Sequence, residues 1–370
     1  MLQQLKVIIS GGGTGGHIFP AIAIANALKK RMPEIEILFV GAEGKMEMEK
    51  VPAAGYKIEA LWISGLQRKL TIKNLMFPFK VISSMIKARK ILKQFNPNVV
   101  VGVGGYASGP MLRVATMAGV PALIQEQNSY PGITNKLLAS KVQKICVAYQ
   151  GMEKYFPKEK IILTGNPVRQ DIQNLEGKEN RAYEFFNLIE DKPVLLVIGG
   201  SLGSRTINES IYELLPVLAE NNIQLIWQTG KTYYETAKQA VLPYTSKGIF
   251  AFDFITKMDY AYAAADLVVS RAGASSVSEL CIVQKPCILI PSPNVAEDHQ
   301  TKNAMALVNY NAAVLVKDAE AKEKLKAEIL RLINSDSEKE KLSINISKLA
   351  FNNAADIIAA EIINLASNKK

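Results

Sequence analysis

Short apolar runs alternate with longer mixed segments along the whole chain. In the first half, glycine, proline or polar residues bound such runs at residues 7–9, 37–40, 99–101, 122–124 and 145–147. Short continuous apolar runs are typical of strands that are buried on both faces of a parallel sheet. Segments of helical length separate the runs, such as residues 20–31, where Pro20 suits the start of a helix.

The same alternation restarts in the second half of the chain. After a turn-rich segment at 164–169 and a polar stretch to residue 192, apolar runs occupy residues 194–198, 225–227, 249–252, 267–269, 287–290 and 314–316. A polar segment at 336–341 then leads to a last amphipathic helix. Its apolar residues include Ile344, Ile346, Leu349, Ile357, Ile358, Ile362 and Ile363.

Two such halves predict an α/β fold with two doubly wound, Rossmann-like parallel-sheet domains that face a cleft. We place the first domain at residues 1–164 and the second at 165–349. Ligands of such sheets bind at the carboxyl ends of the strands. Loops at these ends are therefore the first place to look for chemistry.

The composition excludes several classes of protein. No run approaches the roughly 18 apolar residues of a membrane span, and the N-terminus lacks the apolar stretch of a signal peptide. We therefore expect a cytoplasmic protein. Cys146, Cys281 and Cys287 lie in or beside apolar segments and form no CxxC pair. We interpret them as buried free thiols rather than as zinc ligands.

Positive charge is concentrated in one window. The net charge is +10, and residues 60–125 contain no Asp or Glu. This window holds Arg68, Lys69, Lys73, Lys80, Lys87, Arg89, Lys90, Lys93 and Arg113. Such a block indicates an anionic partner.

Glycine-rich loops follow the predicted strands in both halves. The first spans residues 11–16 and fits GxGxxG, which alone usually indicates NAD. The second strand, however, ends Phe39-Val40-Gly41, with no acid for a ribose hydroxyl. We therefore expect a loop that another molecule approaches closely, with a plain tight turn as the alternative. Further loops lie at residues 102–108, 199–205 and 271–279.

The loop at 271–279 opens a helix with small residues, which suits a diphosphate at the helix N-terminus. Glu279 lies one turn further along, where its carboxylate would accept hydrogen bonds from ribose hydroxyls. The alternative is an exposed glutamate on the helix surface. In the second loop, Ser201 and backbone N–H groups would hold a phosphate or sugar oxygen.

Both histidines lie in suspected site loops. His17 closes the first glycine loop, where a neutral imidazole would take a proton from an attacking hydroxyl, or would merely cap the helix. His299 is expected to be structural, whereas Gln300 would read sugar hydroxyls. Residues 125–128 are four consecutive polar residues at a strand end. They suit hydroxyl recognition, with a simple polar loop as the alternative.

Several motifs are missing from the sequence. There is no Asp-x-Asp pair to hold Mg²⁺ on a diphosphate, no GxxxxGK[ST] phosphate loop and no GxSxG elbow. We therefore expect no metal and no cofactor, with helix N-termini and backbone amides holding the diphosphate instead.

Taken in order, these motifs resemble those of the MurG family of transferases, glycosyltransferase family 28. The resemblance runs from the first strand to the last helix. It is carried by Gly12-Gly-Thr-Gly-Gly-His17, Gly104-Gly-Tyr106, Glu126-Gln-Asn128, Gly165-Asn-Pro-Val-Arg169, Gly199-Gly-Ser201, Arg271-Ala-Gly-Ala274 with Glu279, and His299-Gln300.

The resemblance implies a GT-B fold and transfer of N-acetylglucosamine, with inversion, from UDP-GlcNAc to the MurNAc 4-hydroxyl of lipid I, the undecaprenyl-diphosphate-linked MurNAc-pentapeptide. The product would be lipid II of peptidoglycan synthesis, which serves cell shape and division. It implies a peripheral protein on the cytoplasmic face of a bacterial cell membrane. It also implies that a C-terminal helix, residues 350–370, joins the first domain, which would bind the acceptor and the membrane.

The resemblance also assigns roles to individual residues. His17 is the base that the family favours. Gln125 stands where some members of the family have a histidine, which shifts weight to His17 or Glu126 as the catalytic residue and leaves the choice between them open. Ile255 would offer its backbone to the uracil. The implied donor contacts are Thr14, Gly15, Gly16, Asn128, Arg169, Ser201, Ile255, Ala274, Glu279 and Gln300.

The basic window also predicts contact with an anionic membrane. Between residues 66 and 95, bulky apolar residues are interspersed with the cations, and we expect Pro78 to break the segment into two pieces. The alternative is that these apolar residues pack into the domain core. The expected membrane contacts are Lys69, Lys73, Leu75, Phe77, Phe79 and Lys80.

Three other functions remain as alternatives. A UDP-GlcNAc 2-epimerase would share the fold and the donor but would not need an apolar, basic face. A protein that binds nucleic acid would need a polar, aromatic-punctuated basic surface. A NAD-dependent oxidoreductase would need the missing ribose acid.

Overall fold

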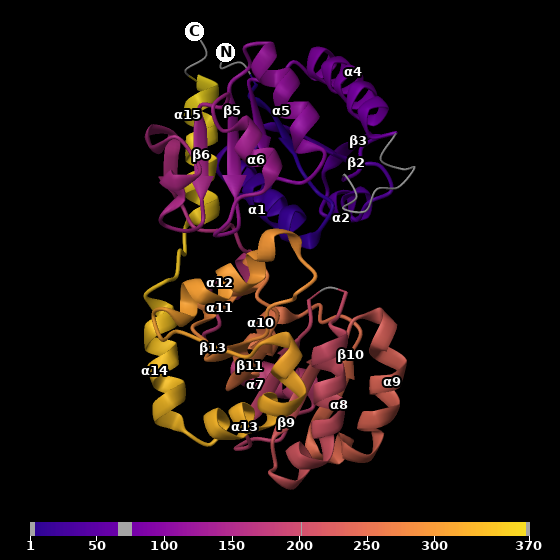
Figure 1. Ribbon diagram of the computed structural model, residues 1–370, viewed down its shortest axis with the longest axis vertical. Coiled ribbons are helices and arrows are strands. Elements are labelled where there is room, and N and C mark those ends of the chain that lie inside the picture. Colours follow the sequence, from indigo (N-terminus) through magenta and orange to yellow (C-terminus); the bar gives the residue numbers. More distant parts are fainter. Residues whose placement is uncertain (1–3, 66–75, 201, 368–370) are drawn as a thin grey trace. The chain divides into compact units, whose positions relative to one another are not determined.

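The computed structural model describes residues 4–65, 76–200 and 202–367. The chain divides into two compact units (Figure 1). Unit 1 contains the residues up to Arg169 together with those from Asn353 onward, and unit 2 runs from Gln170 to Asn352.

The described part of unit 1 is built on one parallel sheet with helices on both faces. The strand order is β3-β2-β1-β4-β5-β6-β7. Successive strands are added on one side of β1 up to β3 and then on its other side from β4 onward, so the switch point lies between β1 and β4. The strands are β1 (Lys6–Ser10), β2 (Glu36–Ala42), β3 (Lys57–Leu61), β4 (Val99–Gly102), β5 (Ala122–Glu126), β6 (Lys144–Val147) and β7 (Ile161–Leu163). The helices are α1 (Gly15–Arg31), α2 (Glu47–Ala53), α4 (Phe77–Phe95), α5 (Ser108–Met117), α6 (Ile133–Leu138) and α15 (Ala354–Ser367).

Unit 2 repeats the plan, with the strand order β10-β9-β8-β11-β12-β13 and the switch point between β8 and β11. The strands are β8 (Val194–Ile198), β9 (Gln224–Gln228), β10 (Ile249–Phe252), β11 (Leu267–Ser270), β12 (Cys287–Leu289) and β13 (Val314–Leu315). The helices are α7 (Glu179–Phe186), α8 (Arg205–Glu220), α9 (Lys231–Val241), α10 (Met258–Ala264), α11 (Ala274–Val283), α12 (His299–Val308), α13 (Ala321–Ile333) and α14 (Asp336–Ser347).

Alternate residues of the central strands supply two cores in unit 1. On β1, Val7 and Ile9 pack on one face with α1 and α15, whereas Ile8 packs on the other face with α4 and α5. The C-terminal helix α15, yellow in Figure 1, lies among the elements of unit 1, where Ile358 and Ile362 are fully buried. Residues at opposite ends of the chain therefore build one core.

The prediction of two parallel-sheet α/β domains is confirmed, and each predicted strand is present. The sequence prediction missed β3 and β7, which are the two edge strands of the sheet in unit 1. Residues of β3 alternate between exposed and partly buried, and β7 has only three residues. Neither therefore carries the continuous apolar run that marks a central strand.

Two predictions about helices are wrong. Helix α1 begins at Gly15, not Pro20, and it accommodates Pro20 in its second turn. Residues 336–347 are helix α14, and a separate helix, α15, begins at Ala354, so the C-terminal region is not one helix after a polar segment. Pro78 lies in the first turn of α4, where its missing N–H is not needed, and residues 66–75 of the segment that it was predicted to divide lie outside the described residues.

The three cysteines are free and buried, as the sequence predicted. Burial raises the pKa of Cys146 and of Cys281 to about 12, and it raises that of Cys287 further. Across the described residues, no helix combines the length and apolar character that a membrane crossing requires.

Candidate functional site

The glycine loop after β1 closes over a buried carboxylate. Glu47, the first residue of α2, is 1% exposed. Its Oε2 accepts a hydrogen bond from the Gly13 N–H at 2.9 Å, and its Oε1 accepts one from the Ala42 N–H at 2.9 Å. Sequence reasoning missed Glu47, because it follows no apolar run and belongs to none of the glycine motifs.

The loop after β4 packs against the glycine loop after β1, at the switch point between β1 and β4. The Gly12 N–H donates to the Gly104 carbonyl at 3.3 Å. A Cβ on Gly105 would lie 2.1 Å from the Gly12 carbonyl oxygen, and Gly105 has a φ of +85°. Only glycine satisfies both conditions, so the two loops form one surface at the switch point of the sheet.

His17 lies in the first turn of α1, together with Gly15 and Gly16, and not in a loop as predicted. Its Nδ1 is 3.1 Å from the Thr14 hydroxyl. The other side of the ring faces Gly104, because a Cβ there would lie 3.0 Å from Nε2. The helix and Thr14 thus orient the imidazole, and the missing side chain of Gly104 leaves space beside Nε2.

Glu126 is buried and holds the loop that follows β5. Its Oε1 accepts from the backbone and side-chain amides of Asn128 at 2.9 and 3.3 Å. Its Oε2 accepts from the Gly132 N–H at 3.1 Å and from Asn135 Nδ2 at 2.8 Å. Burial raises the pKa of Glu126, and these hydrogen bonds partly offset the increase. With four donors on it, the carboxylate shapes the loop and holds Asn128 in place.

The neighbouring amides are buried as well, so an exposed polar loop does not describe them. Gln125, Gln127 and Asn166 are at most 3% exposed. Gln125 Nε2 donates to Asn166 Oδ1 at 2.9 Å, and Asn166 Nδ2 donates to the Gln127 carbonyl at 2.9 Å. Gln127 Nε2 donates to the Val103 carbonyl at 2.7 Å and to Gln125 Oε1. This network ties the loop beside His17 to the segment that leaves unit 1.

Arg169 is the last residue of unit 1 in this part of the chain. Its guanidinium carbon lies 5.7 Å from the centre of the Phe19 ring, in helix α1. A cation over an aromatic face is held by the ring quadrupole. Arg169 therefore lies beside the helix that carries His17.

In unit 2, the loop after β8 contacts the end of β9. A Cβ on Gly203 would lie 2.0 Å from the Thr229 carbonyl oxygen, and Gly203 has a φ of +80°. Gln228 Nε2 donates to the Gly200 carbonyl at 3.1 Å, and its Oε1 accepts from the Ile255 N–H at 2.9 Å. The predicted contact Ser201 lies outside the described residues.

The N–H of Ile255 is thus occupied by Gln228. The sequence analysis did not identify Gln228, although a polar residue at the end of an apolar run is the signal that could have revealed it.

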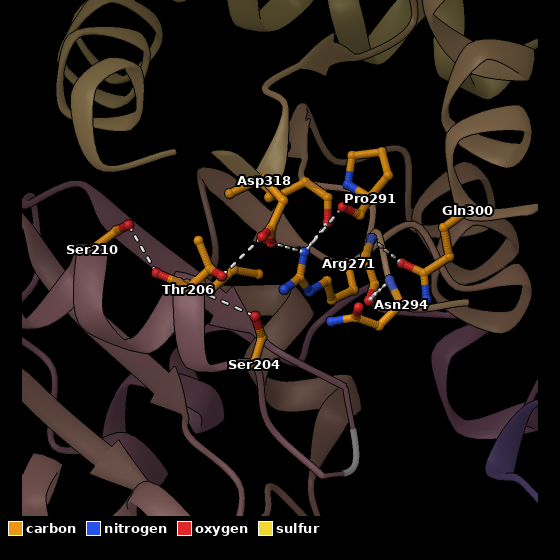
Figure 2. A network of polar contacts seen from close by, with 11 residues as sticks. Ser204, Thr206, Ser210, Arg271, Pro291, Asn294, Gln300 and Asp318 are labelled. Atoms are coloured by element: carbon orange, nitrogen blue, oxygen red, sulfur yellow. Dashed lines mark hydrogen bonds and ion pairs between the residues drawn. The ribbon is translucent and has the colours of Figure 1, made fainter. Parts of the chain in front are cut away.

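Arg271 is a structural residue in a polar network at the ends of β11 and β12 (Figure 2). Its Nη1 donates to the Ile290 and Pro291 carbonyls at 3.0 and 3.1 Å and forms an ion pair with Asp318 at 2.5 Å. Asp318 also accepts from the Thr206 hydroxyl at 3.0 Å. The network joins the β8, β11 and β12 loops into one edge.

Gln300 lies near this network, in the first turn of α12. Its Oε1 accepts from the Ser292 N–H at 2.8 Å, which orients the side-chain amide and turns its donor group the other way. His299 is the first residue of the same helix.

Glu279 is not an exposed surface residue, so that alternative is wrong. It is 8% exposed, and its Oε2 accepts from the hydroxyl of the buried Tyr262 at 3.1 Å. Helix α11 begins at Ala274, after Gly273 in an extended conformation. Ala274 and Glu279 therefore occupy the first turns of a helix at the switch point of unit 2, where an N-terminus attracts an anion.

The apolar residues of α4 divide between the core and the surface. Met76, Phe79, Ile82 and Ile86 are 45–68% exposed. Phe77 is partly buried, and Lys80 donates to the Ser64 hydroxyl at 3.0 Å. The predicted contacts Lys69, Lys73 and Leu75 lie outside the described residues. Packing into the core therefore accounts for only part of this segment.

Comparisons with known proteins were made for the chain as a whole. The model of the glycosyltransferase family 28 N-terminal domain matches residues 7–147, and that of the family 28 C-terminal domain matches residues 194–358. Together they span both units.

Two relatives are named UDP-N-acetylglucosamine–N-acetylmuramyl-(pentapeptide) pyrophosphoryl-undecaprenol N-acetylglucosamine transferase. The chain is 55% identical to that of Flavobacterium psychrophilum over 370 residues, covering 100% of both chains. It is 55% identical to that of Parabacteroides distasonis over 368 residues, with the same coverage.

Among solved structures, MurG of Acinetobacter baumannii is 26% identical, with a TM-score of 0.77 over 97% of this chain and 99% of that one. A UDP-GlcNAc 2-epimerase from Neisseria meningitidis, bound to UDP-GlcNAc, is 16% identical, with a TM-score of 0.67 over 97% and 100%. The second likeness shows the fold alone. The likeness to MurG of Acinetobacter baumannii, together with the two parallel sheets, confirms the predicted GT-B fold. The family models and the full-length relatives show that the chain belongs to glycosyltransferase family 28.

Proposed function

We propose that this protein transfers N-acetylglucosamine from UDP-GlcNAc to the MurNAc 4-hydroxyl of lipid I, with inversion, to form lipid II. The observation that carries the proposal is 55% identity over the full length of transferases with this named activity. Such identity covers both units and not one binding domain. The shaped loops at the switch points of both sheets are consistent with two substrates.

Unit 2 would bind the donor. The diphosphate of UDP-GlcNAc would accept hydrogen bonds at the N-terminus of α11, which begins at Ala274, without a metal ion. The ribose hydroxyls would donate to Glu279, which Tyr262 already orients. The carbonyl oxygen of Ile255 would accept from the uracil, since Gln228 occupies its N–H. Gln300 would contribute its amide donor to a sugar hydroxyl.

Unit 1 would supply the acceptor chemistry. In the productive tautomer, His17 Nδ1–H donates to the Thr14 hydroxyl and leaves Nε2 as the proton acceptor. The 4-hydroxyl oxygen would attack the anomeric carbon, its proton would pass to Nε2, and the bond to UDP would break on the opposite face. Glu126 accepts four hydrogen bonds in its buried setting, so we assign it the positioning of Asn128 rather than proton transfer. Thr14, Gly15, Gly16, Asn128, Arg169 and Ser201 remain proposed contacts to the donor.

The exposed face of α4 would bring the enzyme to its lipid-linked acceptor. Phe79, Ile82 and Ile86 lie on successive turns of one face, and Lys90 and Lys93 are exposed further along the same helix. Apolar side chains enter the headgroup boundary of a membrane while cations bind anionic headgroups. We infer a peripheral protein on the cytoplasmic face of the cell membrane.

Product analysis tests the proposed function. With UDP-GlcNAc and lipid I in detergent micelles, we expect a lipid-linked disaccharide and one UDP for each disaccharide formed. Formation of UDP-N-acetylmannosamine, without any change to lipid I, would instead identify an epimerase.

We predict that Glu279→Ala weakens the binding of UDP. A hydrogen bond to a charged group contributes about 1.5–3 kcal/mol, and the ribose would lose its acceptor. Titration calorimetry with UDP measures the change. Glu235→Ala removes an exposed carboxylate from α9 of the same unit and should leave the affinity unchanged. Equal affinities for parent and Glu279→Ala would remove Glu279 from the donor site.

We predict that His17→Ala lowers single-turnover transfer by about 10²–10⁴-fold, the usual contribution of a general base. The melting temperature should change little, because His17 is partly exposed. Glu126→Gln, in contrast, should lower the melting temperature, because an amide group would face donors that now meet a carboxylate. Normal turnover by His17→Ala would exclude it as the base.

We predict that Phe79→Ser with Ile82→Ser weakens binding to vesicles containing phosphatidylglycerol by about tenfold or more. Binding of the parent should also fall with added salt, because the cations of α4 are screened. Leu242→Ser removes an equally exposed apolar residue from unit 2 and is the matched control. Identical vesicle binding by the double variant and the parent would contradict a role of α4 at the membrane.

A further inference from the structure

We propose that Glu47 is a positioning residue for the transfer reaction, which acts by fixing the glycine turn that leads into His17. The proposal rests on the proposed function and adds to it a residue that belongs to none of the glycine motifs. At 1% exposure, Glu47 cannot contact a substrate. Any effect that it has on catalysis must pass through the backbone that it binds.

The carboxylate joins two segments that are distant in sequence. One oxygen accepts from Ala42 at the end of β2, and the other accepts from Gly13 in the turn after β1, both at 2.9 Å. Gly13 directly precedes Thr14, whose hydroxyl contacts Nδ1 of His17. The position of His17 therefore depends on the Glu47 carboxylate through one turn of backbone.

Two glycines make room for this carboxylate. A Cβ on Gly12 would lie 2.2 Å from Oε1, and a Cβ on Gly41 would lie 2.5 Å from Cγ of Glu47. Real Cβ atoms do not approach other atoms so closely, so any side chain at either position would displace the acid. The backbone thus encloses Glu47 from both sides, and this accounts for a glycine at position 41, one residue before the end of β2.

The geometry requires a carboxylate and not merely a side chain of its size. Gly13 and Ala42 both donate, so both oxygens must accept. A glutamine has one oxygen and one NH₂ group, so one of the two backbone N–H groups would face another donor. A buried donor without an acceptor is costly, and the turn would shift to relieve it. Displacement of a catalytic group by about 1 Å can reduce a rate 10²-fold.

The test compares Glu47→Gln with Glu49→Gln. Both substitutions remove one negative charge from α2, but the side chain of Glu49 is 83% exposed. We expect Glu47→Gln to lower kcat for lipid II formation by about 10–100-fold. We expect its melting temperature to stay close to that of the parent, because the substitution affects one turn and leaves unit 2 untouched. Glu49→Gln should behave as the parent in both measurements.

Hydrogen–deuterium exchange of residues 11–17 gives a readout that does not depend on activity. Exchange should be faster in Glu47→Gln than in Glu49→Gln if the carboxylate holds the turn. Equal kcat and equal exchange in the two variants would overturn the proposal, as would faster exchange throughout both units of Glu47→Gln, which would indicate general unfolding. A parent protein that forms no lipid-linked disaccharide would refute the proposed function instead, and the exchange comparison would still decide the role of Glu47.

Discussion

The constraint on which both units depend is the close approach of backbone turns at the carboxyl edge of each sheet. In unit 1, Gly105 approaches Gly12 so closely that a Cβ would lie 2.1 Å from a carbonyl oxygen. In unit 2, Gly203 approaches Thr229 in the same way, at 2.0 Å. Because these turns lack side chains and have positive φ, backbone segments approach each other closely at the carboxyl edge of each sheet.

Turns built from glycine have no side chains to fix them, and buried polar residues behind them perform that task. Glu126 and Gln127 hold the loops after β5 and β4, and Gln228 and Arg271 hold those of unit 2. The conformation of the glycine motifs thus depends on residues outside them. The proposed proton acceptor in unit 1 and the proposed donor site in unit 2 would both rely on such supporting residues.

The apolar runs of the sequence predicted the central strands and placed each glycine loop at a strand end, because burial on both faces leaves a clear pattern. The edge strands β3 and β7 lack that burial and were missed. The motifs of the sequence singled out His17 and Glu279 as candidates, but they did not predict the surroundings of either residue. Whether Glu279 is exposed depends on Tyr262, which is 17 residues away in sequence, and the partner of Gly13 is Glu47, 34 residues away. Such pairings arise from tertiary packing, which no local spacing encodes.

In the proposed reaction, the acceptor reacts in the space that Gly104 leaves beside Nε2 of His17. The most direct measurement is the single-turnover rate of Gly104→Ala, whose Cβ would lie 3.0 Å from Nε2. Gly119→Ala is the control, because Gly119 also has a positive φ, of +72°, but no atom within 4 Å of its Cβ position. We expect a large loss of transfer in Gly104→Ala and none in Gly119→Ala. Equal transfer rates in the two variants would contradict a reaction beside Nε2.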